Sequence, residues 1–306
     1  MTEPITTEQY YRFVVWSTDA QWFRFLRTRT ELEEINFWRP GVKTLTEVKG
    51  TRCLFLIRGT NEIWGCGTLS AFNVMPVGLA WDIFGPANGF ADLEVFRRKI
   101  ASLKGVSEGQ VGDIGCAVLS SPQYFNDPID YRGFERMYGP TKPYDVRSLE
   151  GARLWTAAVA HFQEAQPILP LIRGGGAKPV LVVPRLGQAT FRIELEKQYS
   201  TRCAVTGERT RPALEAAHIK PFSIVKEHAL QNGLLLRSDI HKLFDQGYVT
   251  VTPDRKFRVS RAIRDEFENG RDYYAYEGTP IRETLSSEAK PASEYLDWHS
   301  ATIFKG

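Results

Sequence analysis

The stretch LEAAHIKPFSIVKEHALQNGLLLRSDIHKLFDQG, residues 214–247, sets polar residues between short apolar segments. One apolar segment ends at His218, and a second follows Asn232. The residues from 239 onward then have helical spacing and stop at Gly247, a residue type that commonly ends helices. The pattern predicts two short strands followed by a helix, with His218, Asn232 and His241 close to the junctions.

These residues resemble the HNH endonuclease superfamily, whose core is a ββα-metal fold. The segments AAHIKP, NGLLLRSDIH and KLFDQG occur in the family's order, and the three polar residues have the family's spacing. The neighbouring segments RLGQATFR and CAVTGE resemble the same subgroup, so the resemblance extends over residues 184–274. It implies a nuclease domain that hydrolyses phosphodiester bonds with the help of a divalent metal ion.

The chemistry of hydrolysis gives each of the three polar residues a role. A neutral imidazole can take a proton from water at physiological pH, and the family position gives this role of general base to His218. The family position of His241 implies a metal ligand. Asn232 either pins the loop after His218 or orients His218 through its side-chain amide.

The second metal ligand is open, because many family members carry Asp or His where this chain has Ala217. Asp245 would share a helix face with His241 at the i, i+4 spacing, and Glu215 would share a strand face with Ala217. We prefer Asp245, although a helix-capping or structural role suits it almost as well. Oxygen-rich ligands favour Mg²⁺, with Mn²⁺ or Ni²⁺ as substitutes.

Two further expectations concern the surroundings of this site. Many family members hold a structural zinc with paired cysteines, but Cys203 has no such pair, so no structural zinc is expected. His228 is expected to be a solvated loop residue rather than a phosphate contact. Four residues are candidates for DNA-phosphate contacts, although surface salt bridges explain the arginines among them equally well: Arg185, Gln188, Arg192 and Arg211.

The first half of the chain mixes short strands with a few helices. Strands are predicted at residues 12–17, 53–58, 63–72 and 114–119, and helices at 19–27, 79–85, 92–103 and 154–163. Residues 36–41 are predicted to lie in a loop. A small β-barrel decorated by helices fits this pattern best.

This half also resembles, more weakly, the PUA-like superfamily and its EVE and YTH-like branches. The segments STD at 17–19, NFW at 36–38 and LFLIRGTNEIWGCGTL at 54–69 carry the resemblance. It implies a reader domain that flips a modified base from the duplex and holds it between aromatic walls. The candidate walls are Trp22, Trp38 and Trp81, and the candidate edge contacts are Ser17, Asp19 and Asn36. Alternatively, tryptophans such as Trp16, Trp22 and Trp64 simply fill a core.

The expected fold class is therefore α+β, with a PUA/EVE-like reader at residues 1–170 and an HNH nuclease domain at residues 184–306. A glycine-rich stretch, residues 171–183, is the predicted linker. The four scattered cysteines and the absence of a long apolar run predict a cytoplasmic protein with reduced thiols and no membrane segment. The net charge of +3 permits nucleic-acid binding but does not by itself indicate it.

Together, the two halves resemble a modification-dependent, type IV-like restriction endonuclease. Its substrate would be double-stranded DNA carrying 5-methylcytosine or 5-hydroxymethylcytosine. Because one HNH site cuts one strand, a double-strand break suggests a homodimer. Two alternatives stay open: an HNH nuclease whose first half senses another ligand or partner, and a catalytically silent nucleic-acid-binding protein.

Overall fold

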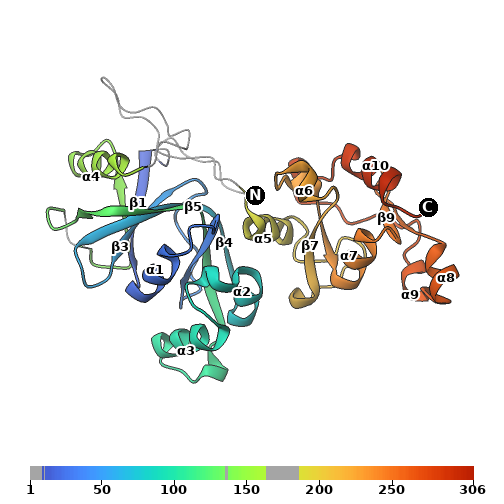
Figure 1. Ribbon diagram of the computed structural model, residues 1–306, viewed down its shortest axis with the longest axis horizontal. Helices are drawn as coiled ribbons and strands as arrows, with labels where there is room; N and C mark the ends of the chain where they lie inside the picture. Colours follow the sequence, from blue (N-terminus) through green and yellow to red (C-terminus); the bar gives the residue numbers. More distant parts are fainter. Residues whose placement is uncertain (1–8, 10, 135–136, 163–185) are drawn as a thin grey trace. The chain divides into compact units, whose positions relative to one another are not determined.

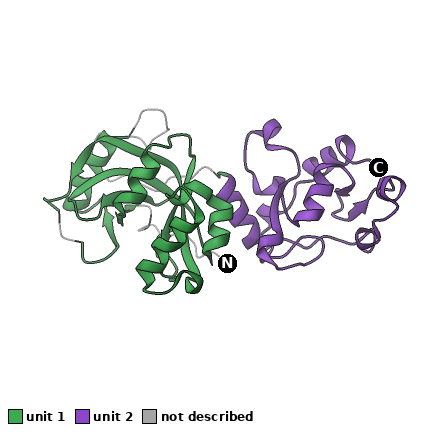
Figure 2. Ribbon diagram, turned by 60° about the horizontal axis from the view of Figure 1, so that its bottom comes forward, with its two compact units in different colours: residues 1–187 green, residues 188–306 purple. Residues whose placement is uncertain are grey.

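A computed structural model describes residues 9, 11–134, 137–162 and 186–306 of the chain. The chain divides into two compact units, residues 1–187 and residues 188–306, drawn in green and purple in Figure 2. The predicted linker at 171–183 and both predicted domain boundaries lie outside the described residues. Among the described residues, no helix is long and apolar enough to cross a membrane.

Unit 1 is built on one six-stranded sheet in the order β2-β5-β4-β3-β1-β6. Strands β1, β3, β4 and β5 of this sheet are labelled in Figure 1. Its strands are β1 (Arg12–Thr18), β2 (Glu34–Arg39), β3 (Arg52–Ile57), β4 (Glu62–Pro76), β5 (Asp113–Asp130) and β6 (Thr141–Asp145). Its helices are α1 (Ala20–Arg27), α2 (Val77–Phe84), η2 (Gly85–Asn88), α3 (Leu93–Lys104), η3 (Glu108–Gln110) and α4 (Leu149–Ala160). β1 and β3 pair in parallel, whereas the other neighbours in this sheet pair antiparallel.

The predicted strands and helices of this half are present, and the mixed α+β class is confirmed. Every residue of β3 is buried, as expected of a strand covered on both faces. The predicted loop at 36–41 is wrong, because residues 36–39 belong to β2 and pair with β5. The turn residues Pro40 and Gly41 that suggested a loop come directly after the strand ends.

Unit 2 contains the predicted strand-strand-helix motif. Its strands are β7 (Leu214–His218), β8 (Gly233–Arg237), β9 (Val249–Val251) and β10 (Phe257–Val259). Its helices are α5 (Gln188–Gln198), η4 (Arg211–Ala213), α6 (Phe222–Val225), η5 (Leu230–Asn232), α7 (Ser238–Asp245), α8 (Ala262–Phe267), α9 (Arg271–Tyr274), η6 (Ser287–Ala289) and α10 (Ser293–Thr302). β7 and β8 pair antiparallel, with His218 opposite Gly233, and α7 follows β8 directly.

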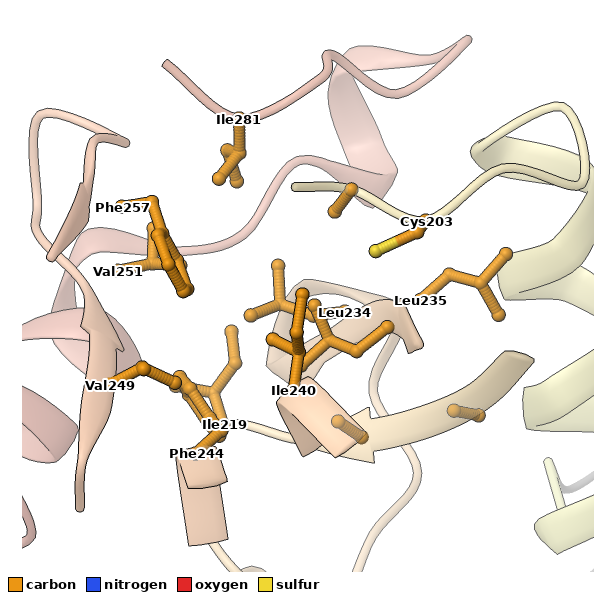
Figure 3. Close-up of a cluster of buried hydrophobic side chains, with 14 of the residues drawn as sticks. Cys203, Ile219, Leu234, Leu235, Ile240, Phe244, Val249, Val251, Phe257 and Ile281 are labelled. Carbon is orange, nitrogen blue, oxygen red and sulfur yellow. The ribbon is translucent and has the colours of Figure 1, made fainter. Parts of the chain in front are cut away.

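The core of unit 2 holds this motif in place. Leu234, Ile240 and Phe244, from β8 and α7, belong to one buried cluster together with side chains from β9 and β10 (Figure 3). α5 lies close to the hairpin, because a Cβ on Gly233 would come within 2.7 Å of a Leu195 methyl group. The lack of a side chain at Gly233 therefore allows α5 to approach the end of β7.

His299, on α10, fixes the last helix against α7. Its ring is 2% exposed and stacks on Phe244 with 3.7 Å between ring centroids. Nε2 donates to the Phe244 carbonyl at 3.0 Å, so Nδ1 accepts from the Thr250 hydroxyl at 2.8 Å. Burial lowers the pKa of His299 to about 4, against the opposing effect of the Phe244 carbonyl.

This pKa predicts a pH-dependent stability. Below about pH 6.5 the unfolded chain binds a proton at His299, whereas the folded chain binds it only near pH 4. The unfolding free energy should therefore fall as the pH drops from 6.5 to 4, by up to roughly 3 kcal/mol from this group. Urea titrations at pH 7 and pH 4.5 should show a smaller fall for His299→Gln, which keeps a donor to the carbonyl. An equal fall in both proteins would contradict this assignment.

Candidate functional site

A cleft of about 340 Å³ in unit 2 brings the predicted catalytic and metal-binding histidines to one place. Its walls come from α5, from β7 and the loop after it, from α7 and from the C-terminal segment. The lining residues are Gln188, Ala216, His218, Ile219, Pro221, Phe222, His241, Asp245, His299 and Ile303.

His218 ends β7 with its ring held on two sides. The ring stacks on Phe191 of α5 with 4.3 Å between centroids and 8° between planes. Its Nε2 lies 3.0 Å from Nδ1 of His228. Burial lowers the pKa of His218 to about 4, and the charges of His228 and His241 act in the same direction. The imidazole is therefore neutral at physiological pH, which is the form that can accept a proton.

Asn232 is fully buried and holds the loop that follows His218. Its Oδ1 accepts from the Lys220 backbone N–H at 2.8 Å, and its Nδ2 donates to the Lys220 carbonyl at 2.8 Å. The backbone carbonyl of Asn232 also accepts from the N–H of Ile219 at 2.9 Å. Of the two roles left open by the sequence, these contacts favour pinning of the loop.

His241, in the first turns of α7, lies between the two carboxylates considered as metal ligands. Its Nδ1 is 2.6 Å from Oε2 of Glu215, and its Nε2 is 3.4 Å from Oδ2 of Asp245. Burial raises the pKa of Asp245; the charge of His241 opposes this shift and that of Glu215 adds to it. Both carboxylates thus reach the ring, one at each nitrogen.

The described side chains of the cleft offer a divalent ion only a partial set of ligands. Within residues 9, 11–134, 137–162 and 186–306, no group of three or more His, Cys, Asp or Glu side chains has the geometry to hold a metal. Glu215 and Asp245 contact opposite ring nitrogens, so as placed they cannot join His241 around one ion. A pair formed by Nε2 of His241 and the Asp245 carboxylate fits an ion that keeps water and phosphate oxygens as its other ligands.

Several expectations about the surroundings need correction. His228 is not a solvated loop residue, because it is 8% exposed and hydrogen-bonded to His218. For Arg192 and Arg211, the contacts favour the ion-pair role over phosphate contact, because both side chains reach the buried carboxylate of Glu196, at 3.4 Å and 2.7 Å. Gln188 lines the cleft, as a DNA-contacting residue would, and Arg185 lies outside the described residues.

Unit 1 has a pocket of about 410 Å³ beside the ends of β1 and β2. It is lined by Ser17, Thr18, Asp19, Trp22, Phe37, Trp38, Arg39, Pro40, Gly41, Lys43, Arg58, Leu103, Pro140 and Thr141. Four of the six residues predicted for a base pocket are among them. The other two do not line this pocket: Asn36 is buried and its Nδ2 donates to Oδ1 of Asn88 at 2.8 Å, and Trp81 packs against Phe96 on α3.

The aromatic residues of this pocket differ in how firmly they are held. Trp22 is 2% exposed and donates to the Asn36 carbonyl, and Trp38 is 9% exposed and donates to the Asn88 carbonyl. Phe37 is half-buried and packs on the ring of Trp22 with 5.4 Å between centroids. Sequence reasoning missed Phe37 because its strand was interpreted as a loop.

Asp19 has structural partners as well as a place in the pocket. Its Oδ1 caps α1 by accepting from the N–H groups of Gln21 and Trp22, and its Oδ2 pairs with Lys99 at 2.8 Å. Burial raises the pKa of Asp19, but Lys99 and the two N–H groups outweigh this and leave the pKa lowered. The group is therefore a fixed carboxylate at the pocket wall.

A comparison with family models matches a part of unit 2. Residues 203–252 match the family model of the HNH endonucleases, and no curated protein matches the chain. Among solved structures, the ASCH protein of Zymomonas mobilis is 16% identical over 47% of this chain and 93% of its own, with a TM-score of 0.33. A single-substitution variant of that protein is 12% identical over 49% of this chain and 97% of its own, with a TM-score of 0.36.

The modification-dependent TagI restriction endonuclease is 12% identical over 89% of this chain and 75% of its own, with a TM-score of 0.28. The residues matched by the family model include His218, Asn232 and His241, the polar residues of the cleft and its loop. Residues 203–252 form the HNH endonuclease domain of a metal-dependent nuclease.

Proposed function

We propose that the chain is a modification-dependent endonuclease that hydrolyses phosphodiester bonds in double-stranded DNA carrying 5-methylcytosine or 5-hydroxymethylcytosine. One observation carries the nuclease part of this proposal. A single cleft is lined both by a neutral imidazole, His218, and by a histidine-carboxylate pair, His241 and Asp245. This combination supplies a base for water and ligands for a cation, which are the two needs of phosphodiester hydrolysis.

His218 acts as the general base. It takes a proton from the water molecule whose oxygen attacks phosphorus, while the bond from phosphorus to the leaving 3′-oxygen breaks. The lowered pKa keeps the ring unprotonated at physiological pH. The Asn232 side chain hydrogen-bonds both the backbone N–H and the carbonyl of Lys220, in the loop next to the base. These bonds fix the cleft wall before DNA binds.

His241 and Asp245 are proposed as the ligands of Mg²⁺, with Mn²⁺ or Ni²⁺ as substitutes. Glu215 accepts from the Nδ1–H of His241 and thereby leaves the lone pair of Nε2 free, on the side of Asp245. When bound, the ion stabilises negative charge on the phosphate and on the leaving oxygen. Glu215 is thus a positioning residue rather than the second ligand.

The pocket of unit 1 is proposed to hold the flipped modified base. Phe37 offers the least buried aromatic ring of the pocket for stacking, and Ser17 and Asp19 supply polar atoms at its wall. Lys43 and Arg58 are exposed at the pocket and suit contacts with the neighbouring phosphates. A planar base with a charged backbone matches this mixture of aromatic and basic groups.

The reader proposal is tested with matched plasmids that contain plain cytosine, 5-methylcytosine or 5-hydroxymethylcytosine, digested with Mg²⁺ and with Mn²⁺. The wild-type chain should cut a modified plasmid at least about tenfold faster, since loss of base contacts costs about 1–3 kcal/mol. Phe37→Ala should lose this preference. Phe25→Ala is the control, because Phe25 is half-buried on α1 and does not line the pocket.

The outcomes separate the alternatives. Equal cutting of all three plasmids by the wild-type chain would sink the reader proposal but leave a nuclease. Failure to cut with either metal would favour a silent binding protein. Nicked circles would indicate one HNH site acting at a time, whereas linear product at rising protein concentration would support a homodimer.

The metal site predicts a ranking of Mn²⁺ affinities in the absence of DNA. Glu215→Gln should weaken binding by about ten- to a hundredfold, as replacements of orienting partners do, and Asp245→Asn should weaken it more. Asp254→Asn is the matched control, because this carboxylate pairs with Lys256 in the turn between β9 and β10. Calorimetric titration measures the affinities, and wild-type binding by Asp245→Asn would exclude Asp245 as a ligand.

A further inference from the structure

Four rings meet beside the candidate base. His218 stacks on Phe191, and His228 stacks on Phe222 with 4.3 Å between centroids and 17° between planes. The two histidine rings lie 5.0 Å apart and are inclined at 45°. This four-ring cluster (Phe191, His218, Phe222, His228) joins α5, the end of β7 and the loop that contains α6.

The two histidines are joined by a single hydrogen bond between ring nitrogens. Nε2 of His218 and Nδ1 of His228 are 3.0 Å apart, so one of the two atoms carries the shared proton. If His228 donated it, the Nε2 lone pair of neutral His218 would be occupied and its own proton would sit on Nδ1. No lone pair would then be free for water.

The opposite arrangement leaves His218 competent. With the proton on Nε2 of His218 and a bare Nδ1 on His228, the second ring nitrogen of His218 keeps its lone pair. That atom, Nδ1, has no hydrogen-bond partner among the described residues. The hydrogen bond of one ring nitrogen thus decides which nitrogen of the base is reactive.

Burial holds His228 in place as the hydrogen-bond partner of His218. His228 is 8% exposed, and the ring of Phe222 covers one of its faces, so water cannot easily replace it. Asn232, four residues later, pins the backbone at Lys220 and so closes the loop that carries His228. The ring is held by the same loop that forms the cleft wall.

We propose that His228 is a positioning residue for the general base: its Nδ1 accepts the Nε2–H of His218 and fixes the tautomer in which Nδ1 of His218 is the proton acceptor. This inference rests on the proposed role of His218 in hydrolysis. It adds a residue outside the three polar positions by which the site was found.

Two substitutions at position 228 separate positioning from packing. His228→Phe keeps a ring for stacking on Phe222 but removes the acceptor, whereas His228→Asn loses the ring but offers an amide oxygen near the place of Nδ1. If His228 positions the base, His228→Phe should lower kcat by about ten- to a hundredfold with KM for DNA unchanged, and His228→Asn should recover part of the loss. His161→Phe, at a half-buried histidine stacked on Phe125 in unit 1, is the matched control and should keep wild-type cleavage.

The decisive readout does not need DNA. Nitrogen-15 NMR of the histidine rings in the full chain reports which nitrogen of His218 carries the proton. The wild-type chain should show the proton on Nε2, and His228→Phe should show a mixture or the Nδ1–H form. A wild-type proton on Nδ1 of His218, or an unchanged tautomer and kcat in His228→Phe, overturns the inference.

His218→Ala keeps this result separate from the proposed function. If His218→Ala cleaves plasmid with Mn²⁺ as the wild-type chain does, the general base has been misassigned. If His218→Ala is inactive while His228→Phe cleaves normally, the role of His228 is wrong and the nuclease proposal stands.

Discussion

The nuclease cleft depends on one buried amide that must find partners for its polar atoms. Asn232 meets this requirement by bonding both backbone groups of Lys220, and so ties the loop after β7 to the start of β8. An unpaired buried amide would cost about 1–3 kcal/mol, so the loop closes in one way. The closed loop places His218 in the cleft wall and holds His228 within hydrogen-bond distance of the His218 ring.

The spacing of residues in the sequence predicted the parts of the site that depend on helix and strand periodicity. The i, i+4 spacing placed Asp245 beside His241, and strand alternation placed Glu215 within its reach, as the contacts show. Periodicity could not predict which of the two carboxylates, Glu215 or Asp245, would be the metal ligand and which would orient His241. That depends on which ring nitrogen each one contacts, and a tertiary distance decides it.

The errors have other causes. The sequence predicts a solvated His228, whereas Phe191 and Phe222 pack against its ring, and no local pattern indicates such stacking. The sequence leaves phosphate contact and ion pairing equally open for Arg192 and Arg211, and the buried carboxylate of Glu196 contacts both. In unit 1, the turn residues at the end of β2 hid a strand, and with it the inward Asn36 and the pocket-lining Phe37. The environments of His228 and Arg211 are set by partners elsewhere in the chain, whereas Arg192 pairs with Glu196 four residues along its own helix.

The Asn232–Gly233 pair has a consequence for the chemical lifetime of the protein. An asparagine followed by glycine is prone to deamidation, because the glycine nitrogen can attack the side-chain carbonyl and close a succinimide ring. Here the amide is held by Lys220, and the N–H of Gly233 donates to the Leu230 carbonyl, so the folded chain resists ring closure. Deamidation at this pair therefore requires molecules in which the loop has locally unfolded. An aspartate formed at position 232 could no longer donate to the Lys220 carbonyl. The rate of deamidation is thus set by the stability of the loop after β7, which also forms the cleft wall.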